Sequence, residues 1–301
     1  MRSWLHRVGP IVGGMLRRLL TPRLFRAGPP HPARDHRIDI YTFVTDEDDY
    51  AGMLASFRLA GFAECATFVR LSDATSEPFS AITDIGRGSG APYAVLCHQD
   101  IRLTAISTPA RLFGILDQLE RRDGGWWAAG PAGVTQELEV ARAVLDLWGG
   151  RSDHDMPVLV MSLDEVFLIL NRANQPRCTP DLRGFHFYGT DLCLNAIAAG
   201  GSCYVVDFQV IHLGLGNLKD GYRPAYDTVR QAMVDAWATR LWPTYIGTTI
   251  EVLALSRCGL VSRVMNSERT IRWVSEARSR SGLEAVAAEI SAMLPDVRRQ
   301  P

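Results

Sequence analysis

FHFYGTDLCLNAIAAGGSCYVVDFQVIH, residues 185–212, is the stretch that decides the fold of this chain. Its apolar spacing predicts a helix over Tyr188–Ala199, which a pair of glycines ends, and its apolar run after the glycines predicts a strand over Ser202–Phe208. Asp191 lies at the start of the predicted helix, and His212 lies just past the strand. A helix that leads directly into a strand is the repeating unit of α/β sheets, so the sequence predicts a layered α/β fold.

Two stretches upstream predict further strands of the same sheet. Ile38–Val44 alternates and is rich in β-branched and aromatic residues, and Cys65–Leu71 follows it after a stretch with helical spacing. This strand–helix–strand opening is the kind that builds parallel sheets. Ala91–Ile101 is a continuous apolar run, which suits a strand buried on both faces, and it turns polar at its carboxyl end. The prediction is therefore a mixed, mostly parallel sheet flanked by helices.

The remaining segments predict shorter elements and set the domain boundaries. Pro157–Arg172 consists of two apolar runs around an acidic turn, which predicts a hairpin. Beyond Lys219 the chain is rich in Trp, Arg and Ala, and we predict helices over residues 226–241, 245–264, 267–279 and 283–294. The chain is thereby divided into a basic arm (1–37), an α/β domain (38–219) and a helical C-terminal extension (220–301).

The composition excludes several classes of protein. The chain has 301 residues, 47% of them hydrophobic, and a net charge of −1, which indicates an ordinary core and argues against nucleic acid as a partner. The six cysteines are scattered, with no CxxC pair and no His/Cys spacing typical of structural zinc. Reduced thiols of this kind favour the cytoplasm over a secreted compartment.

The basic arm carries eight arginines and no acid before Asp35. Its apolar run is broken by proline and glycine and falls far short of the roughly 20 residues that span a bilayer, so no transmembrane helix is predicted. Its arginines and neighbouring leucines form either an interfacial patch for anionic lipid or a disordered leader, and both interpretations stay open. In the first interpretation, residues 1–34 contact the inner face of the plasma membrane.

Polar residues at strand and helix ends are the candidates for chemistry. Asp100 follows a buried strand, where its carboxylate either binds a divalent ion or caps the next loop. His212 holds a similar position and is either a ligand for an ion such as Mn²⁺ or a structural imidazole. Asp191 is either a general base or the cap of its helix, and Asp164 and Glu165 are either substrate contacts or turn residues.

The order of these segments carries a family resemblance. The chain places IDIYTFV first, then a strand that ends in HQDI, the turn GPAG, LDEVFLI, FHFYGTDLC and a last strand that ends in VIH. Together these segments resemble the GT-A glycosyltransferases, and more closely the bacterial family-two-like group whose metal motif is HQD. The resemblance covers Ile38–Gly216.

The resemblance implies a nucleotide-sugar donor and a divalent metal, Mn²⁺ or Mg²⁺, held by Asp100 and His212. It also implies that Asp191 is the catalytic base for the acceptor. His98 departs from the usual DxD motif, which has an acid here, and this leaves open whether Asp100 binds the metal directly or through water. By position, the nucleotide contacts are Val44, Thr45, Asp46, Asp73, His98 and Gln99, and the acceptor contacts are Asp164, Glu165 and Tyr188.

The activity expected from the resemblance is a metal-dependent, inverting transfer of a sugar to a glycan or lipid-linked acceptor in bacterial envelope, capsule or polysaccharide synthesis. The alternative from another class is a catalytically silent GT-A domain that serves as an assembly or membrane-docking module. A nucleotidyltransferase ranks lower, because TDEDD stands where a glycine-rich loop is needed after the first strand. A dehydrogenase is least expected, because GRGSG precedes a strand instead of following one.

Overall fold

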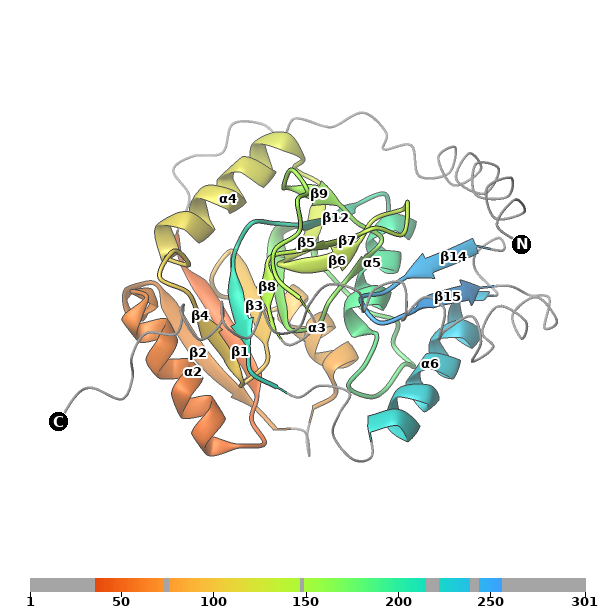
Figure 1. The fold of residues 1–301 in the computed structure, drawn as a ribbon, viewed down its shortest axis with the longest axis horizontal. Coiled ribbons are helices and arrows are strands. Elements are labelled where there is room, and N and C mark those ends of the chain that lie inside the picture. The colour runs from red at the N-terminus through yellow and green to blue at the C-terminus, as the bar shows by residue number, and fades with distance from the viewer. Residues whose placement is uncertain (1–35, 73–75, 147–148, 215–221, 239–243, 256–301) are drawn as a thin grey trace.

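The computed structural model describes residues 36–72, 76–146, 149–214, 222–238 and 244–255 (Figure 1). Its centre is a seven-stranded sheet in the order β2-β1-β3-β11-β5-β12-β9. The strands are β1 (Ile38–Phe43), β2 (Ala66–Leu71), β3 (Tyr93–Cys97), β5 (Trp126–Gly130), β9 (Val158–Leu159), β11 (Phe167–Asn171) and β12 (Ser202–Val205). β1 pairs in parallel with β2 and β3, and β5 with β12, whereas β11 and β9 run antiparallel to their neighbours. The expected mixed α/β sheet is confirmed.

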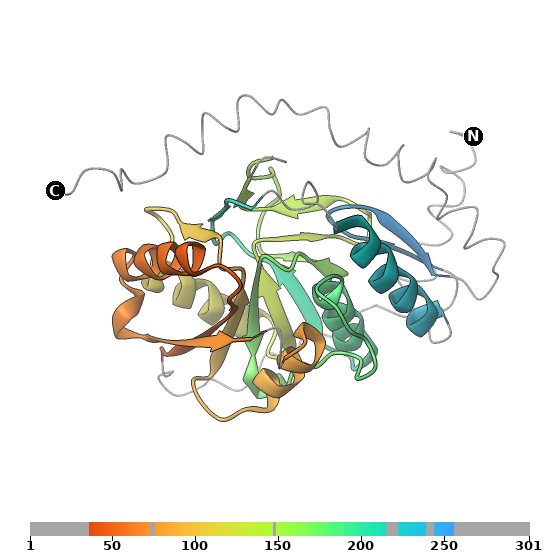
Figure 2. The same ribbon diagram turned by 90° about the horizontal axis from the view of Figure 1, so that it is seen from below.

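Helices cover both faces of this sheet (Figure 2). On one face, α2 and α4 bury Met53, Phe57 and Leu116 in one core. On the other face, α3 and α5 bury Ile82 and Leu192 in a second core, to which α6 also contributes. The helices are α2 (Glu47–Leu59), α3 (Pro78–Arg87), α4 (Pro109–Arg122), α5 (Tyr188–Ala198) and α6 (Tyr222–Ala238), with 3-10 turns η1 (Phe62–Glu64) and η2 (Arg172–Asn174). Within the part of the chain that the structure describes, no helix is long and apolar enough to cross a membrane.

Three small sheets adjoin the central one. The first has the order β10-β6-β7, the second β4-β13-β8, and the third is the pair β14-β15. Their strands are β4 (Ile101–Leu103), β6 (Ala132–Val134), β7 (Val140–Arg142), β8 (Val144–Leu145), β10 (Ser162–Leu163), β13 (Val210–His212), β14 (Thr244–Gly247) and β15 (Val252–Leu255). In the second small sheet, β4 directly follows the turn after β3 and pairs with β13, so the turn lies next to the end of β13.

The predicted hairpin over residues 157–172 is wrong. β9 pairs with β12, β10 pairs with β6, and β11 pairs with β3 and β5, so the apolar runs of this segment enter different sheets. The pattern identified strands but not their partners, because alternation and burial report the environment of a strand and not its neighbour.

The C-terminal segment differs in part from its prediction. α6 confirms the helix expected over residues 226–241, but residues 244–255 form the antiparallel pair β14-β15 where a helix was expected. This stretch is rich in β-branched residues and has a glycine before its turn. Both features favour a hairpin, and they outweigh the helical spacing of its apolar residues. The two later predicted helices lie outside the described residues, as does the basic arm up to residue 35.

The predicted domain boundary at residue 219 also falls outside the described residues. On either side of it, the chain contributes to the same core: Tyr226, Met233 and Trp237 of α6 and Leu253 of β15 pack in one cluster with Leu192 of α5. The described residues after the boundary, 222–238 and 244–255, therefore pack on the α/β domain.

Candidate active site

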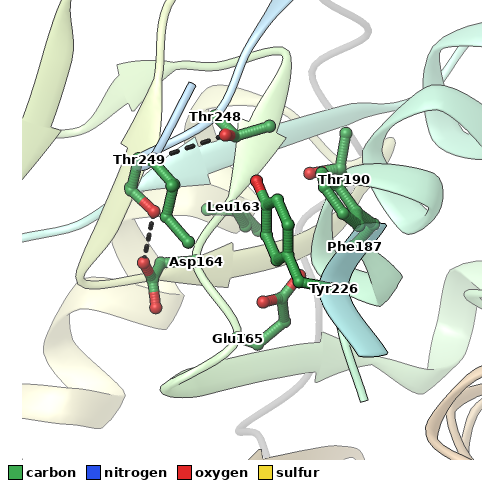
Figure 3. Close-up of a pocket in the computed structure, with 9 residues that line it drawn as sticks. Leu163, Asp164, Glu165, Phe187, Thr190, Tyr226, Thr248 and Thr249 are labelled. Carbon is green, nitrogen blue, oxygen red and sulfur yellow. Dashed lines mark hydrogen bonds between the residues drawn. The ribbon is translucent and has the colours of Figure 1, made fainter. Parts of the chain in front are cut away.

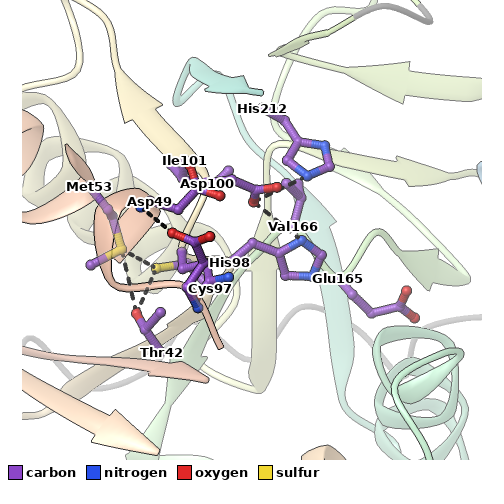
Figure 4. Close-up of polar contacts among 12 residues, drawn as sticks. Thr42, Asp49, Met53, Cys97, His98, Asp100, Ile101, Glu165, Val166 and His212 are labelled. Carbon is purple, nitrogen blue, oxygen red and sulfur yellow. Dashed lines mark hydrogen bonds and ion pairs between the residues drawn. The ribbon is translucent and has the colours of Figure 1, made fainter. Parts of the chain in front are cut away.

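His98, Asp100 and His212 come together beside the carboxyl end of β3 (Figure 4). One possible ligand atom from each residue lies within 4.8 Å of the others. The Oδ1 atom of Asp100 is 3.4 Å from Nε2 of His212 and 3.9 Å from Nδ1 of His98. The two predicted metal ligands are thus neighbours, and the histidine that replaces the first acid of the usual motif is the third member.

Strand pairing places these residues next to one another. β3 ends one residue before His98, and β4 begins one residue after Asp100. β4 and β13 are antiparallel with Ile101 opposite His212, and the amide of Leu213 donates to the carbonyl of Asp100 at 3.1 Å. Because backbone pairing fixes both chain segments, the imidazole and the carboxylate face each other before any ligand arrives.

The charges within the cluster are set by burial and by mutual contact. Burial alone would raise the pKa of Asp100, but His212 and His98 outweigh it and hold that pKa at about 2. Burial, with His212 second, lowers the pKa of His98 to about 4. Burial also acts to lower the pKa of His212, yet contact with Asp100 raises it. At neutral pH, the cluster presents a carboxylate and a neutral His98 imidazole, both competent as metal ligands.

The donor set and the space around it fit a divalent cation. Oδ1 of Asp100 is buried and accepts no hydrogen bond from any described residue, although both rings lie within ion-pair distance. A Cβ placed on Gly214 would overlap Oδ2 of Asp100 and approach Nε2 of His212 to 2.9 Å, so the glycine keeps this side of the cluster open. Two imidazoles and one carboxylate suit a borderline ion such as Mn²⁺.

Cys97 adjoins this cluster but is not a nucleophile. Its thiol lies 3.5 Å from Oγ1 of Thr42 and 3.8 Å from Sδ of Met53 (Figure 4). Burial is the largest cause that raises the pKa of the thiol to about 12. The thiolate is the reactive form of cysteine, so this residue is packing.

Gln99 connects the cluster to the loop after β1. Its Oε1 accepts from the amides of Thr45 and Asp46 at 2.8 and 3.0 Å, and its Nε2 donates to Oγ1 of Thr45 at 2.8 Å. Asp46 in turn caps α2 by accepting from the amides of Asp48 and Asp49. The structure therefore joins three of the predicted nucleotide contacts.

Val44 and Asp73 are the other predicted nucleotide contacts outside the cluster. Val44 follows β1, and its amide donates to the carbonyl of Leu71 at the end of β2. Asp73 lies outside the described residues. The roles of these residues toward a nucleotide stay predictions.

Asp164 and Glu165, two of the three predicted acceptor contacts, line a pocket at the start of α5 (Figure 3). Oδ1 of Asp164 accepts from the amide of Val166 at 3.1 Å, and its Oδ2 accepts from Oγ1 of Thr249 at 2.6 Å. Tyr188 joins this region to the cluster of His98, Asp100 and His212, because its hydroxyl lies 3.4 Å from Nε2 of His98. The pocket is lined by Leu163, Asp164, Glu165, Phe187, Thr190, Tyr226, Thr248, Thr249 and Ile250.

Asp191 does not face a cleft, as had been expected of a base. Its side chain is 0% exposed. The amide and Oγ1 of Thr179 donate to its two oxygens at 2.6 and 2.7 Å, Nδ2 of Asn195 donates at 3.1 Å and Nε1 of Trp237 at 2.7 Å. The carboxylate is not a helix cap either, because α5 begins at Tyr188 after Phe187. Asp191 instead joins α5 to α6 and to the segment before α5.

Several contributors to the site were missed by sequence reasoning. Gly214 belongs to the motif HLGLG, whose glycines could have indicated a close approach to the preceding histidine. Thr248 and Thr249 could not have been found, because their segment was predicted to be helical and instead supplies the turn of β14-β15.

Comparisons with known proteins give one relative by sequence and several by structure. No protein-family model matches the chain. Among solved structures, the chain is similar to GalNAc-T7 with UDP, GalNAc and Mn²⁺ (8% identity, TM-score 0.44, 66% of this chain and 48% of that one). It is also similar to the mannosyltransferase PcManGT from Pyrobaculum calidifontis in complex with GDP-Man and Mn²⁺ (12% identity, TM-score 0.44, 96% and 89%).

By sequence, the chain is 32% identical over 191 residues to a protein of Fuscovulum blasticum named "ATP synthase subunits region ORF 6", a match that spans 58% of this chain and 74% of that protein. The level of identity and the share of the relative that is covered are sufficient to group the two. The chain belongs to the family of this Fuscovulum blasticum protein.

Proposed function

We propose that this protein is a metal-dependent glycosyltransferase that moves a sugar from a nucleotide-sugar donor to a hydroxyl group of a glycan or lipid-linked acceptor. The observation that carries the proposal is the cluster of His98, Asp100 and His212, whose buried carboxylate oxygen has no hydrogen-bond partner among the described residues. The order of sequence motifs, which resembles the GT-A glycosyltransferases, gives the proposal its reaction class.

Each part of the site has a role in this proposal. Asp100 and His212 would hold the divalent ion, with His98 beside them, and the ion would neutralise charge on the departing diphosphate. The loop of Thr45 and Asp46, which Gln99 holds against the metal cluster, would contact the nucleotide. Val44 and Asp73 would complete these contacts by their position after β1 and β2.

The setting is part of the proposal as well. We expect inversion at the anomeric carbon and a role in bacterial envelope, capsule or polysaccharide synthesis in the cytoplasm. Residues 1–34 would hold the protein at an anionic membrane surface, because arginines near anionic lipids are attracted to them.

A second candidate function is a nucleotide-binding module of the same fold that does not transfer sugar. The observation that favours it is Asp191, the acid expected to act as base, whose carboxylate is buried and bonded to four donors. This module would bind nucleoside diphosphate with Mn²⁺. It would not cleave a nucleotide sugar, so no nucleoside diphosphate would be released from one. The two functions are separated by a single measurement of turnover.

The first prediction concerns binding. We expect the melting temperature to rise when a nucleoside diphosphate and Mn²⁺ are present together and to change little with either alone. At a ligand concentration about 100 times the Kd, binding stabilises the folded state by about 2.7 kcal/mol, which moves the melting temperature by several degrees. A thermal-shift screen of UDP, GDP, CDP and ADP, each with and without Mn²⁺, measures this. If no member of the panel gives a metal-dependent shift, the proposed function is wrong.

A second prediction concerns Gln99. In Gln99→Glu the two loop amides keep an acceptor, but a negative charge is added next to the metal cluster and the diphosphate. Two like charges about 4 Å apart repel by about 1 kcal/mol in water, so binding of UDP or GDP with Mn²⁺ should weaken roughly fivefold. Calorimetry measures the affinity, with exposed Gln175→Glu as the matched control. Equal affinities in the two variants would show that no anion binds beside Gln99.

A further inference from the structure

Glu165 occupies the amino end of α5 from outside the helix. The helix starts after Phe187, whose φ of 65° is left-handed and whose side chain makes no capping bond. Oε1 of Glu165 accepts instead from the amide of Gly189 at 3.3 Å. Backbone amides at a helix start favour a negative charge nearby, so the position is suited to a carboxylate.

The sequence of α5 makes room for this carboxylate. A Cβ on Gly189 would overlap the carbonyl oxygen of Leu163 and lie 3.5 Å from Cγ of Glu165. Glycine therefore lets the segment with Glu165 lie against the first turn of the helix, and the glutamate side chain lines the pocket shown in Figure 3.

The three acids of this region differ in what their oxygens can still accept. Asp191 is buried with four donors, and both oxygens of Asp164 receive a hydrogen bond from the protein. Glu165 receives its bonds from backbone amides at the start of α5. A carboxylate has about four acceptor positions, so the positions of Asp191 are filled, whereas Glu165 and Asp164 both retain capacity for a hydroxyl group that enters the pocket.

The pocket adjoins the metal cluster through backbone and hydroxyl contacts. The amide of His98 donates to the carbonyl of Val166 at 3.1 Å, and the hydroxyl of Tyr188 lies 3.4 Å from both Nε2 of His98 and the carbonyl of Glu165. Figure 4 shows Asp100 and His212 on one side of the His98 ring and Glu165 on the other. A sugar bound beside the cluster could thus be reached by an acceptor held in the pocket.

Hydroxyl groups give the pocket its ligand chemistry. Thr190, Tyr226, Thr248 and Thr249 line it together with the two acids, whereas no lysine or arginine is among its lining residues. The hydroxyls of Tyr226 and Thr248 donate to Glu251, and that of Thr249 donates to Asp164. A lining of hydroxyl and carboxylate oxygens suits the hydroxyl group of a neutral ligand better than an anionic group. Burial first, and the charge of Asp164 second, raise the pKa of Glu165 well above its usual value, so that its ionised carboxylate is a stronger base than that of an ordinary glutamate.

We infer that Glu165 is the catalytic residue that takes the proton of an acceptor hydroxyl that enters this pocket, and that this hydroxyl belongs to a neutral polyol; the inference rests on the proposed function. In the step, the acceptor O–H bond breaks and its proton passes to the Glu165 carboxylate. The oxygen forms a bond to the anomeric carbon of the donor, and the bond from that carbon to the diphosphate breaks, with its electron pair leaving on the diphosphate.

The test is Glu165→Gln in the full chain. The amide oxygen of glutamine can still accept from the Gly189 amide, so the start of α5 is preserved while basicity is removed. UDP-glucose, UDP-galactose and GDP-mannose are supplied with Mn²⁺ and p-nitrophenyl glycosides as acceptors, and release of nucleoside diphosphate is measured. We expect the variant to turn over at least about a hundredfold more slowly than the wild type. Binding of nucleoside diphosphate with Mn²⁺ and the melting temperature should stay unchanged.

Glu77→Gln is the matched control. Oε2 of Glu77 accepts from the amide of Gly184 at 2.8 Å, which is the same kind of contact at a place away from the pocket lining. This variant should turn over at the wild-type rate. A further readout is the dependence of rate on pH: the fall in rate at acid pH that protonation of a base causes should be present in the wild type and absent from the residual activity of Glu165→Gln.

The outcomes separate this inference from the proposed function. Wild-type turnover with an equally active Glu165→Gln overturns the role of Glu165 alone, because the residue is then only a helix cap. A wild type that binds nucleoside diphosphate with Mn²⁺ but releases none from any donor overturns both and leaves the silent module. If Glu165→Gln melts much earlier than the wild type, Glu165→Asp is compared with Glu165→Ala: a base one methylene shorter should retain more turnover, and equal rates overturn the inference.

Discussion

Asp100→Ala is expected to weaken the manganese-dependent binding of nucleoside diphosphate at least about a hundredfold, which corresponds to about 2.7 kcal/mol of binding free energy. Asp100 supplies the negatively charged ligand of the cluster, and its Oδ1 lies within 4 Å of both imidazoles. Without it, two imidazoles would remain to hold the cation and no carboxylate would balance its charge, so a diphosphate that binds through the cation would bind more weakly.

The measurement is a calorimetric titration of UDP or GDP, whichever gives the larger thermal shift, in the presence and absence of Mn²⁺. His212→Ala should change the affinity in the same direction, because its imidazole lies opposite the same carboxylate. Asp84→Ala, at an exposed site in α3, is the control and should bind as the wild type does. Unchanged, metal-dependent affinity in both Asp100→Ala and His212→Ala would exclude this cluster as the metal site.

Asp191→Asn is expected to lower the free energy of unfolding by about 2–4 kcal/mol, since each buried polar group left without a partner costs about 1–3 kcal/mol. Asparagine keeps the shape of the side chain, but one of its two terminal atoms becomes an NH₂ group. That group would face donors already present, either the Thr179 amide and Asn195 or the Thr179 hydroxyl and Trp237. The Thr179 hydroxyl can reverse and accept, which limits the loss.

Urea denaturation followed by fluorescence measures this change, and the midpoint should fall while its dependence on urea concentration stays constant. Asp181→Asn is the control, because Asp181 is exposed in the segment just before α5 and should change stability by less than about 0.5 kcal/mol. A variant with wild-type stability and no sugar transfer would return Asp191 to the role of catalytic base and contradict the geometry described above.

The proximity of Asp100 and His212 could be predicted from the sequence because the positions of both residues follow one rule. Function in an open α/β sheet gathers where strands end, and both Asp100 and His212 directly follow or end an apolar run. The antiparallel register of β4 and β13 then brings them side by side, a detail that needed the structure. Gln99 was expected to contact the nucleotide by position, but its bonds to the loop after β1 depend on the angle between two strand ends and carry no sequence signal.

Asp191 and residues 244–255 show where local patterns stop being informative. The first turn of α5 looked open to the cleft, yet Thr179 and Trp237 approach it from segments that are distant in sequence, and only tertiary packing reveals them. Residues 244–255 have a spacing compatible with a helix, but their side chains Ile246, Leu253 and Leu255 enter the core as members of a strand pair. In both cases burial by a remote element decided the outcome over local preference.

The hydrogen bond from Trp237 to Asp191 has a consequence for how such a gene can be cut or recombined. Motif similarity suggests an exchangeable module that stops near residue 216, but a fragment ending there would keep the acid and lose the indole that neutralises part of its charge. It would also uncover the side chains that face Tyr226, Met233 and Trp237. The folding unit therefore extends at least through β15, and a fragment that keeps α5 must also carry the α6 segment.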